Sequence, residues 1–226
     1  MGKKQDTIYA LSTPPGKSAI AVVRVSGSKA YQYVNEMSSS MPKLPNKSVL
    51  NILRTPTGSV IDQTITTYFK APKSFTGEEM VEISMHGGNA IIKKFINIFK
   101  KNKNTRIAEP GEFTRRSFEN NKLDLSQAEA IADLVNAETE MQRKQAYKEL
   151  EGEVSSITKN IYNELKKVLA NTEAIIDFTD EELPKNLIES IKEQTKNINK
   201  SINMILYSSK GVEKIRSGFV VAIIGN

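Results

Sequence analysis

Apolar residues in the first half of the chain follow the short runs and alternations typical of β-strands. Prolines and glycines separate these runs, and apolar positions at helical spacing lie between them. The predicted strands are 8–11, 19–25, 65–69 and 80–85, and the predicted helices are 28–37 and 89–101. This mixture predicts an α+β domain over residues 1–120.

The second half of the chain has a helical pattern. Ser126 and Glu129 form a capping-box sequence, which predicts a helix that begins at Ser126. Apolar residues at helical spacing predict two further helices, over 154–168 and 187–205. Amphipathic helices of this length pack on one another or on a partner. Residues 121–214 are therefore predicted to form a helical domain.

The last residues resemble a short buried strand that runs into a glycine. A polar linker is predicted over 210–217, followed by the apolar run 219–224 and Gly225. The strand before a phosphate-binding loop begins in this way, although many other buried strands also end in glycine. We expect residues 215–226 to be the first strand of a nucleotide-binding α/β domain that has been truncated.

Composition excludes several classes of site. The chain has no cysteine, which excludes disulfides, thiolate metal sites and cysteine nucleophiles, and its one histidine excludes a histidine-rich metal site. No apolar run approaches the roughly 20 residues of a membrane span, and the polar N-terminus lacks the apolar core of a signal peptide. A cytoplasmic protein without a membrane segment is expected.

Positive charge is concentrated in the first half. Residues 1–120 contain 18 lysines and arginines against nine acidic residues, whereas residues 121–226 contain 14 against 17. The basic half would attract nucleic acid, phosphate or a polycarboxylate ligand such as a folate. The ordinary alternative, for example for Lys93-Lys94 and Lys100-Lys101, is a solvated helix face.

Charged residues in apolar strands are the first candidates for a site. Arg24 lies inside an apolar strand, so it requires either a carboxylate partner or a ligand. Glu82 has apolar neighbours too, and could form a structural ion pair with Arg24 or accept hydrogen bonds from a pterin-like ring. Lys122 lies at the junction of the two predicted domains, where ligand clefts often occur.

Three other segments give weaker indications of a functional site. The rigid loop at 13–17 either holds a ligand through Lys17 or is a plain turn. His86 precedes two glycines and has no evident serine or cysteine partner, so a hydrogen-bonded turn residue is favoured over a catalyst. The acidic run at 177–182 is read as a solvated loop, with a cation site as the alternative.

Six ordered motifs resemble the MnmE family, also called TrmE, of bacterial tRNA uridine-modification GTPases. The motifs are T-P-P-G-K at 13–17, A-V-V-R-V-S-G at 21–27, F-T-G-E at 75–78, H-G-G at 86–88, P-G-E-F-T at 110–114 and K-L-D-L-S-Q-A-E-A at 122–130. The resemblance covers essentially the whole chain, including I-D-F at 176–178 and the predicted strand at its end.

The resemblance implies an N-terminal domain similar to the folate-binding domain of the glycine-cleavage aminomethyltransferases. It implies binding of 5-formyl- or 5,10-methylene-tetrahydrofolate, homodimerisation through the same domain, and a helical domain into which a GTPase domain is inserted. With the flavoprotein MnmG (GidA), the family builds a carboxymethylaminomethyl-type group at carbon 5 of the wobble uridine of certain tRNAs. The folate supplies one carbon, and GTP hydrolysis depends on K⁺ and Mg²⁺.

The family's folate contacts match Arg24, Glu82 and Lys122. As a hypothesis, Glu82 takes the pterin N–H edge, while Arg24 and Lys122 address carbonyl, formyl or glutamate oxygens. The GTPase motifs after Gly225 and the family's C-terminal helices with their cysteine motif are absent. No catalytic or metal-ligating residue and no GTPase activity are therefore expected of this chain, and helices 126–207 are expected to be loose or otherwise packed.

Two other functions stay open on the sequence. The chain could be a stand-alone folate-binding module that senses the cofactor. Alternatively, the basic N-terminal half could serve tRNA docking or dimerisation without a small ligand; steep salt dependence of RNA binding would favour tRNA docking.

Overall fold

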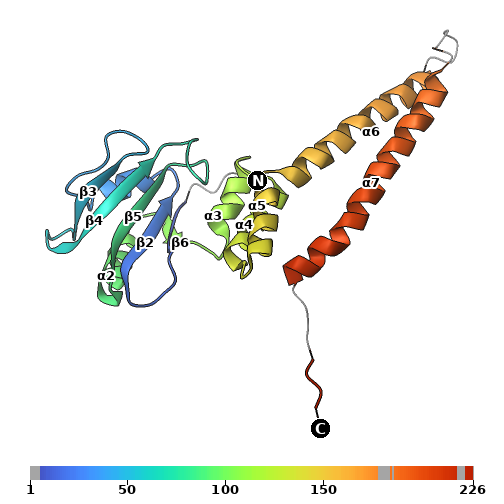
Figure 1. Ribbon diagram of the computed structural model, residues 1–226. Coiled ribbons are helices and arrows are strands. Elements are labelled where there is room, and N and C mark those ends of the chain that lie inside the picture. Colours follow the sequence, from blue (N-terminus) through green and yellow to red (C-terminus); the bar gives the residue numbers. More distant parts are fainter. Residues whose placement is uncertain (1–5, 178–183, 185, 218–221, 226) are drawn as a thin grey trace. The chain divides into compact units, whose positions relative to one another are not determined.

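The structure, a computed structural model, describes residues 6–177, 184, 186–217 and 222–225. It divides into two compact units, Met1–Leu123 and Asp124–Asn226 (Figure 1). The N-terminal unit contains the strands, and the described elements of the second unit are helices. The prediction of an α+β domain followed by a helical domain is confirmed.

The N-terminal unit is built on a six-stranded sheet. The strands are β1 (Thr7–Leu11), β2 (Ser18–Ser26), β3 (Ser48–Arg54), β4 (Val60–Phe69), β5 (Met80–Gly87) and β6 (Thr105–Ile107). Their spatial order is β3-β4-β5-β2-β1-β6, with β1 and β6 parallel and the other neighbours antiparallel. The four predicted strands all form, but β3 and β6 were not predicted. In β3 the polar Asn51 interrupts the apolar pattern, yet it is buried and donates to the Ser38 and Thr66 hydroxyls.

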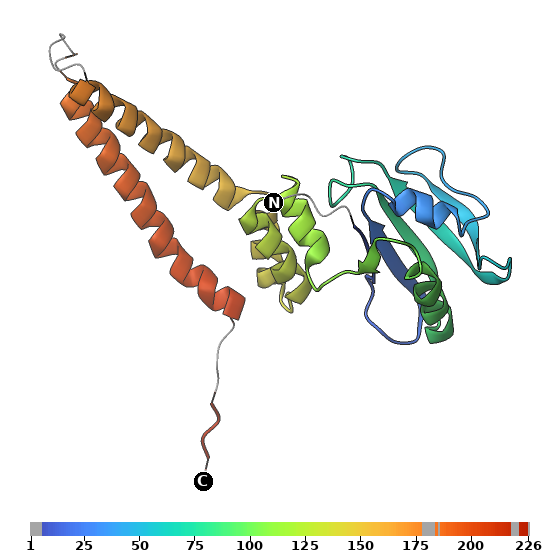
Figure 2. The same ribbon diagram turned by 180° about the vertical axis from the view of Figure 1, so that it is seen from behind.

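Two helices, α1 (Ala30–Asn35) and α2 (Asn89–Phe99), cover one face of this sheet (Figure 2). Both were predicted, and the apolar spacing of α2 explains its position. Ile92, Phe95 and Phe99 lie on one side of α2 and are buried in the core against the inward-facing side chains of β2 and β5. The Phe99 ring also meets the Tyr9 ring edge-to-face, with centroids 4.9 Å apart.

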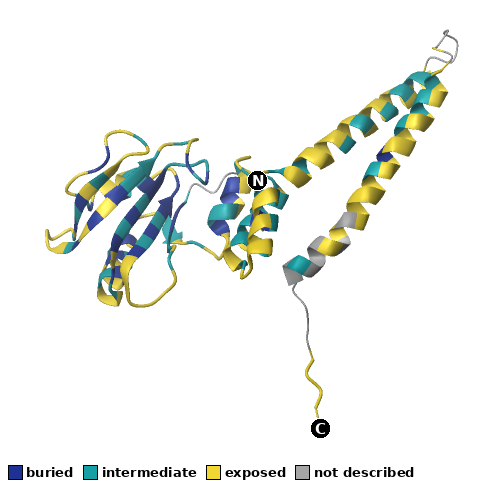
Figure 3. Ribbon diagram, in the orientation of Figure 1, coloured by how far each residue is buried: buried dark blue, intermediate teal, exposed yellow. Residues whose placement is uncertain are grey.

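The opposite face of the sheet is more open (Figure 3). Because side chains alternate along a strand, the residues between the core positions of β2, β4 and β5 point to this face. Ile20 on β2 and Ile65 on β4 are 62% and 51% exposed there. Arg24 on β2 and Glu82 on β5 are direct cross-strand partners on the same face. The two charged residues singled out from the sequence therefore lie side by side.

Helix α3 (Glu112–Glu119) was not among the predicted helices. Its buried residues are Glu112, Arg116 and Ser117, so the side that packs on the protein is polar. Hydrophobic periodicity cannot reveal a helix of this kind, because it assumes an apolar buried side. Gly111, in the left-handed region at φ 74°, marks the residue before the helix.

The second unit contains four described helices where three were predicted. They are α4 (Leu125–Asn136), α5 (Glu140–Leu150), α6 (Glu153–Asp177) and α7 (Leu187–Ser217). Helix α5 was missed because its polar sequence has only a weak apolar pattern. Its start nevertheless has a clear local signal, since Thr139 and Gln142 form a capping box.

The predicted cap of α4 was also wrong. The capping residue is Asp124, whose Oδ1 accepts from the Gln127 amide at 2.9 Å, while Gln127 Oε1 accepts from the Asp124 amide at 3.0 Å. Ser126 lies inside the first turn and donates its hydroxyl to Asp124 Oδ1. An aspartate two residues earlier therefore takes the role predicted for Ser126, with Gln127 in place of Glu129.

The linker predicted over 210–217 is helical instead, because α7 continues to Ser217. A polar stretch of helix is not distinguishable from a linker by hydropathy alone. Residues 222–225 do not form a strand, and no neighbouring strand among the described residues pairs with them. The rest of the predicted strand, 218–221 and 226, lies outside the described residues, as does 178–182 of the acidic run.

Helices α6 and α7 contact one another where α6 ends and α7 begins, but they diverge from there and leave much apolar surface uncovered (Figures 1 and 3). Helix α6 has no buried residue, and Tyr162 and Leu169 on it are 63% and 58% exposed. On α7, Met204 is 61% exposed. Two helices cannot enclose a core by themselves, which agrees with the expectation of incomplete packing. None of the helices in the described part of the chain has the length and apolar character needed to cross a membrane.

Candidate functional site

The candidate site centres on an ion pair that spans strands β2 and β5. Arg24 donates from Nε and Nη2 to Glu82 Oε1, at 2.9 and 2.6 Å. About a quarter of each side chain remains exposed. The requirement for a partner, which the sequence raised for Arg24, is thus met by Glu82. Both hydrogen bonds use the same carboxylate oxygen, so Arg24 leaves the acceptor capacity of Glu82 Oε2 unused.

Two aromatic rings flank the Arg24 guanidinium. Its Cζ lies 5.1 Å from the centre of the Phe75 ring and 5.5 Å from that of Phe113. Both distances are within the range of a cation–π interaction. The two rings come from segments far apart in sequence, the loop after β4 and helix α3. Both belong to motifs noted in the sequence but were given no role there, and an aromatic residue two positions from a glycine in each motif was the available signal.

Lys122 joins this region through the loop of residues 74–78. A Cβ built on Gly77 would lie 3.2 Å from Lys122 Cγ, so the lysine stem packs directly on that glycine. The Lys122 amide donates to the Ser117 carbonyl at 2.8 Å, which ties it to the end of α3. The lysine side chain is otherwise exposed. The loop that presents Phe75 to Arg24 therefore also supports Lys122.

Beside this site lies a buried cluster of charges. Arg116, whose side chain is 6% exposed, pairs with Asp6, Glu78 and Glu112 at 2.7, 3.2 and 3.2 Å. Arg106 pairs with Asp6 and Glu112 at 2.6 and 2.5 Å. Since Ser26 also donates to Glu78, the cluster joins the N-terminus, β2, β6 and α3. It holds α3, and with it Phe113, in place on the sheet.

Burial by itself raises the pKa of Glu112, but hydrogen bonds from Arg106 and Arg116 and from the Glu109 amide outweigh it and hold this pKa at about 2, against an ordinary value of 4.5. The pKa of Asp6 is lowered in the same way, against its own burial. A carboxyl whose pKa is lower in the folded state favours folding when ionised. The stabilisation is therefore complete above about pH 4.5 and is lost as the pH falls towards 2.

We accordingly expect the N-terminal unit to lose stability between about pH 4.5 and pH 2. Amide hydrogen exchange of β2 and β5 at a series of pH values would follow this unit alone. The Glu112→Gln variant, which cannot titrate at this position, should be less stable at neutral pH but show a flatter profile. Parallel profiles of the two proteins would contradict the assignment.

His86 and Thr13, the first residue of the 13–17 loop, make hydrogen bonds within the sheet unit. Asp62 accepts from the His86 amide and contacts His86 Nδ1, both at 2.8 Å, which confirms a hydrogen-bonded histidine. His86 lies within β5 rather than in a turn. The loop at 13–17 connects β1 to β2, and Thr13 Oγ1 accepts from the Val22 amide at 3.3 Å. Among the described residues, no cluster of His, Cys, Asp and Glu could hold a metal ion.

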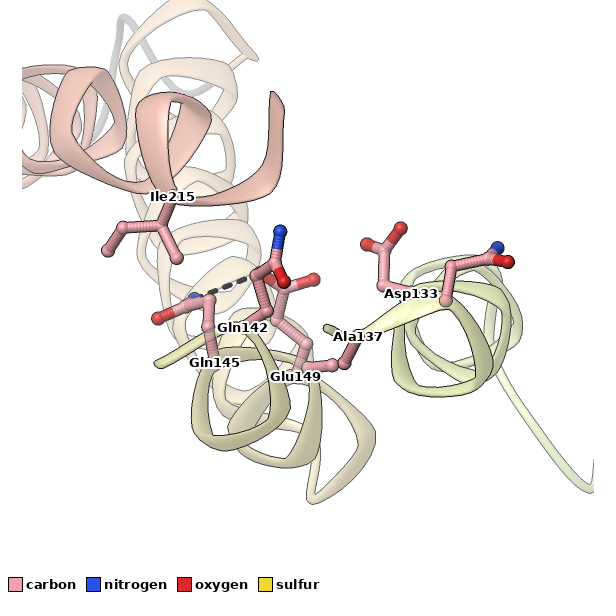
Figure 4. A pocket seen from close by; sticks show the side chains of 8 residues that line it. Asp133, Ala137, Gln142, Gln145, Glu149 and Ile215 are labelled. Atoms are coloured by element: carbon pink, nitrogen blue, oxygen red, sulfur yellow. Dashed lines mark hydrogen bonds between the residues drawn. The ribbon is translucent and has the colours of Figure 1, made fainter. Parts of the chain in front are cut away.

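A small cavity in the helical unit contains none of the predicted residues (Figure 4). It lies between α4, α5 and the end of α7, where Gln145 Nε2 donates to Glu149 Oε1 at 2.9 Å and Ile215 contributes an apolar wall. Its volume is about 70 Å³. Pockets for small organic ligands are several times larger, from roughly 300 Å³ upwards. This cavity is therefore a gap at a helix junction.

Comparison with known proteins gives the family. Residues 7–122 match the family model described as the N-terminus of the GTP-binding protein TrmE, and residues 125–220 match that of the MnmE helical domain. The chain belongs to the MnmE (TrmE) family. The match to the N-terminal TrmE model, over residues 7–122, includes the whole sheet, the ion pair of Arg24 and Glu82, and Lys122.

Individual relatives agree with this assignment. The chain is 42% identical over 97% of its length to the tRNA modification GTPase MnmE of Pelagibacter ubique, and 41% identical over 97% to that of Dinoroseobacter shibae. It is 39% identical over 98% to the tRNA modification GTPase MnmE of Aquifex aeolicus. These matches cover 50%, 51% and 49% of the relatives. The chain thus spans about half the length of the curated relatives it matches.

Proposed function

We propose that the N-terminal unit binds a reduced folate, 5-formyl- or 5,10-methylene-tetrahydrofolate, through Arg24, Glu82 and Lys122. The observation that carries this proposal is the partly exposed Arg24–Glu82 pair on the open sheet face, with Phe75 and Phe113 beside it. A folate combines a planar pterin that has N–H donors with an anionic glutamate tail. A site with a carboxylate, two cations and aromatic rings offers matching groups for each part.

The residues present fit such a ligand. Glu82 keeps Oε2 for the N–H edge of a pterin, because Arg24 bonds only to Oε1. Arg24 and Lys122 can address carbonyl, formyl or carboxylate oxygens. When bound, the folate would supply a one-carbon unit. The chain's own residues would hold and orient the ligand, and the charged cluster around Arg116 would keep the Phe113 side of the site in place.

For the whole protein we propose the activity of a tRNA modification GTPase. It would add a carboxymethylaminomethyl-type group to carbon 5 of the wobble uridine of certain tRNAs, together with a flavoprotein partner of the MnmG (GidA) type. Family membership and the names of the relatives support the GTPase and tRNA parts. GTP with K⁺ and Mg²⁺ would bind in a GTPase domain, the N-terminal units would form a homodimer, and the protein would act in the cytoplasm.

The folate proposal is tested by calorimetric titration of 5-formyltetrahydrofolate into the 226-residue chain. We expect saturable binding that Glu82→Ala weakens roughly 10- to 100-fold, since a hydrogen bond to a charged group contributes about 1.5–3 kcal/mol. Arg24→Ala should also weaken binding. Glu36→Ala, on the helix-covered side of the sheet, is the matched control and should bind as the wild type does. A folded wild-type chain that binds no folate would refute the proposal.

A further inference from the structure

Helix α2 and the turn after it present a surface of lysines. Its members, the α2 lysine surface from here on, are the exposed residues Lys93, Lys94, Lys100, Lys101 and Lys103. The nearest carboxylates in sequence are Glu82 and Glu109. Within the described part of the chain, none of these lysines has an ion pair. The positive charge of this surface is therefore not neutralised locally.

Most arginines of the N-terminal unit differ in this respect. Those at positions 24, 106, 115 and 116 pair with carboxylates, while Arg54 donates to the Gly58 carbonyl. Most of the unit's acidic residues are engaged in the same ion pairs. The excess positive charge of the first half of the sequence is consequently displayed by lysines, and α2 carries the densest group of them.

The arrangement of the α2 lysine surface follows from the packing of the helix. Ile92, Phe95 and Phe99 face the core, so Lys93 and Lys94 lie on the outer side of α2, and Lys100, Lys101 and Lys103 follow in the turn after it. Residues seven apart are two helical turns apart, which separates Lys93 from Lys100 by about 10 Å along the axis. Arg24 and Glu82 lie on the opposite face of the sheet, so the two surfaces can be changed independently.

We propose that the α2 lysine surface docks the phosphate backbone of RNA, an inference that rests on the proposed tRNA function. Lysine is a compact charge on a flexible stem, suited to phosphates but not to the bidentate reading of bases. A membrane surface does not fit, because the apolar side of α2 is buried and nothing remains to insert. The core of a protein interface is normally depleted in lysine. The surface therefore provides sequence-independent affinity for a tRNA.

The test is fluorescence anisotropy of a labelled tRNA transcript titrated with the 226-residue chain between about 50 and 200 mM salt. The variant K93Q/K94Q/K100Q/K101Q should bind at least roughly tenfold more weakly at the lower salt. The slope of log K against log salt should become shallower by about 0.7–0.9 for each phosphate that the protein no longer neutralises. The matched control K43Q/K47Q/K70Q/K73Q removes the same charge from exposed loops of the same unit and should stay close to the wild type.

Equal decreases in affinity in both variants would show that net charge alone matters and would overturn the proposal. An unchanged slope in the α2 variant would overturn it as well. A wild-type chain that binds no tRNA would also overturn the proposal. The folate proposal is decided separately, by the folate titration. Both variants should retain folate binding, because neither alters Arg24, Glu82 or Lys122.

Discussion

Replacing Arg116 by methionine is expected to lower the free energy of unfolding of the N-terminal unit by about 3–5 kcal/mol. The guanidinium is almost fully buried and joins the carboxylates of Asp6, Glu78 and Glu112. Burial lowers the pKa of Arg116, but Glu78, Asp6 and Glu112 together raise it, so the residue stays charged. Removing it leaves Glu78 without an arginine among the described contacts, while Asp6 and Glu112 keep Arg106 and Glu112 also keeps the more distant Arg115.

The measurement is amide hydrogen exchange of β2 and β5, which reports the opening of this unit without the helical one. Arg115→Met is the matched control. Arg115 neighbours Arg116 on α3 but its side chain is 49% exposed. Its ion pairs with Glu109, Glu112 and Glu119, at 3.2, 3.5 and 4.0 Å, therefore contribute less than about 1 kcal/mol. Arg116→Lys should fall between the two, since it keeps the charge but not the planar fork. Similar decreases in stability in Arg116→Met and Arg115→Met would contradict the proposed role of the cluster.

Replacing Gly87 by alanine should destabilise the same unit by about 3 kcal/mol, the upper part of the range for overpacked sites. A Cβ at this position would lie 2.1 Å from Ser18 Oγ and 2.5 Å from the Ser18 carbonyl oxygen. The hydroxyl can rotate away, but the carbonyl belongs to the backbone of β2, which is paired with β5. The two strands would have to separate at the end that adjoins Ile20 and His86.

Gly88→Ala is the matched control for this prediction. A Cβ on Gly88 would meet only the Ile91 side chain, at an ordinary 3.6 Å. We expect a cost below about 1 kcal/mol, arising from its position as the residue before α2. The measurement is again hydrogen exchange of β2 and β5. If the two alanine variants were equally stable, the close approach of Ser18 to Gly87 would not be a determinant of the fold.

The close approach at Gly87 is only partly predictable from the sequence. Two consecutive glycines at 87–88 permit a close approach of another segment, and Ser18 approaches Gly87 in this way. The sequence did not indicate which glycine was needed or what it would meet. That depends on the pairing of β2 with β5, whose residues are more than 50 positions apart.

A helix whose buried side is charged cannot be predicted from hydrophobic periodicity. Helix α2 was predicted because its buried side is apolar, whereas α3 was missed because its buried side is made of Glu112, Arg116 and Ser117. Burial of such residues is possible only when partners arrive from elsewhere, here Asp6, Glu78 and Arg106. Nothing in the local sequence of α3 specifies those partners.

Local elements with a regular apolar pattern, the order of the two domains, and the need of Arg24 for a partner could all be predicted from the order of the amino acids. These properties depend on residues close together in the chain, so periodicity and side-chain chemistry suffice to recognise them. The folded chain was needed to show that Glu82 is the partner, that Phe75 and Phe113 flank Arg24, and that the α2 lysines stay unpaired. Each of these depends on segments that meet only when the sheet is assembled, and such contacts leave no local trace in the order of the residues.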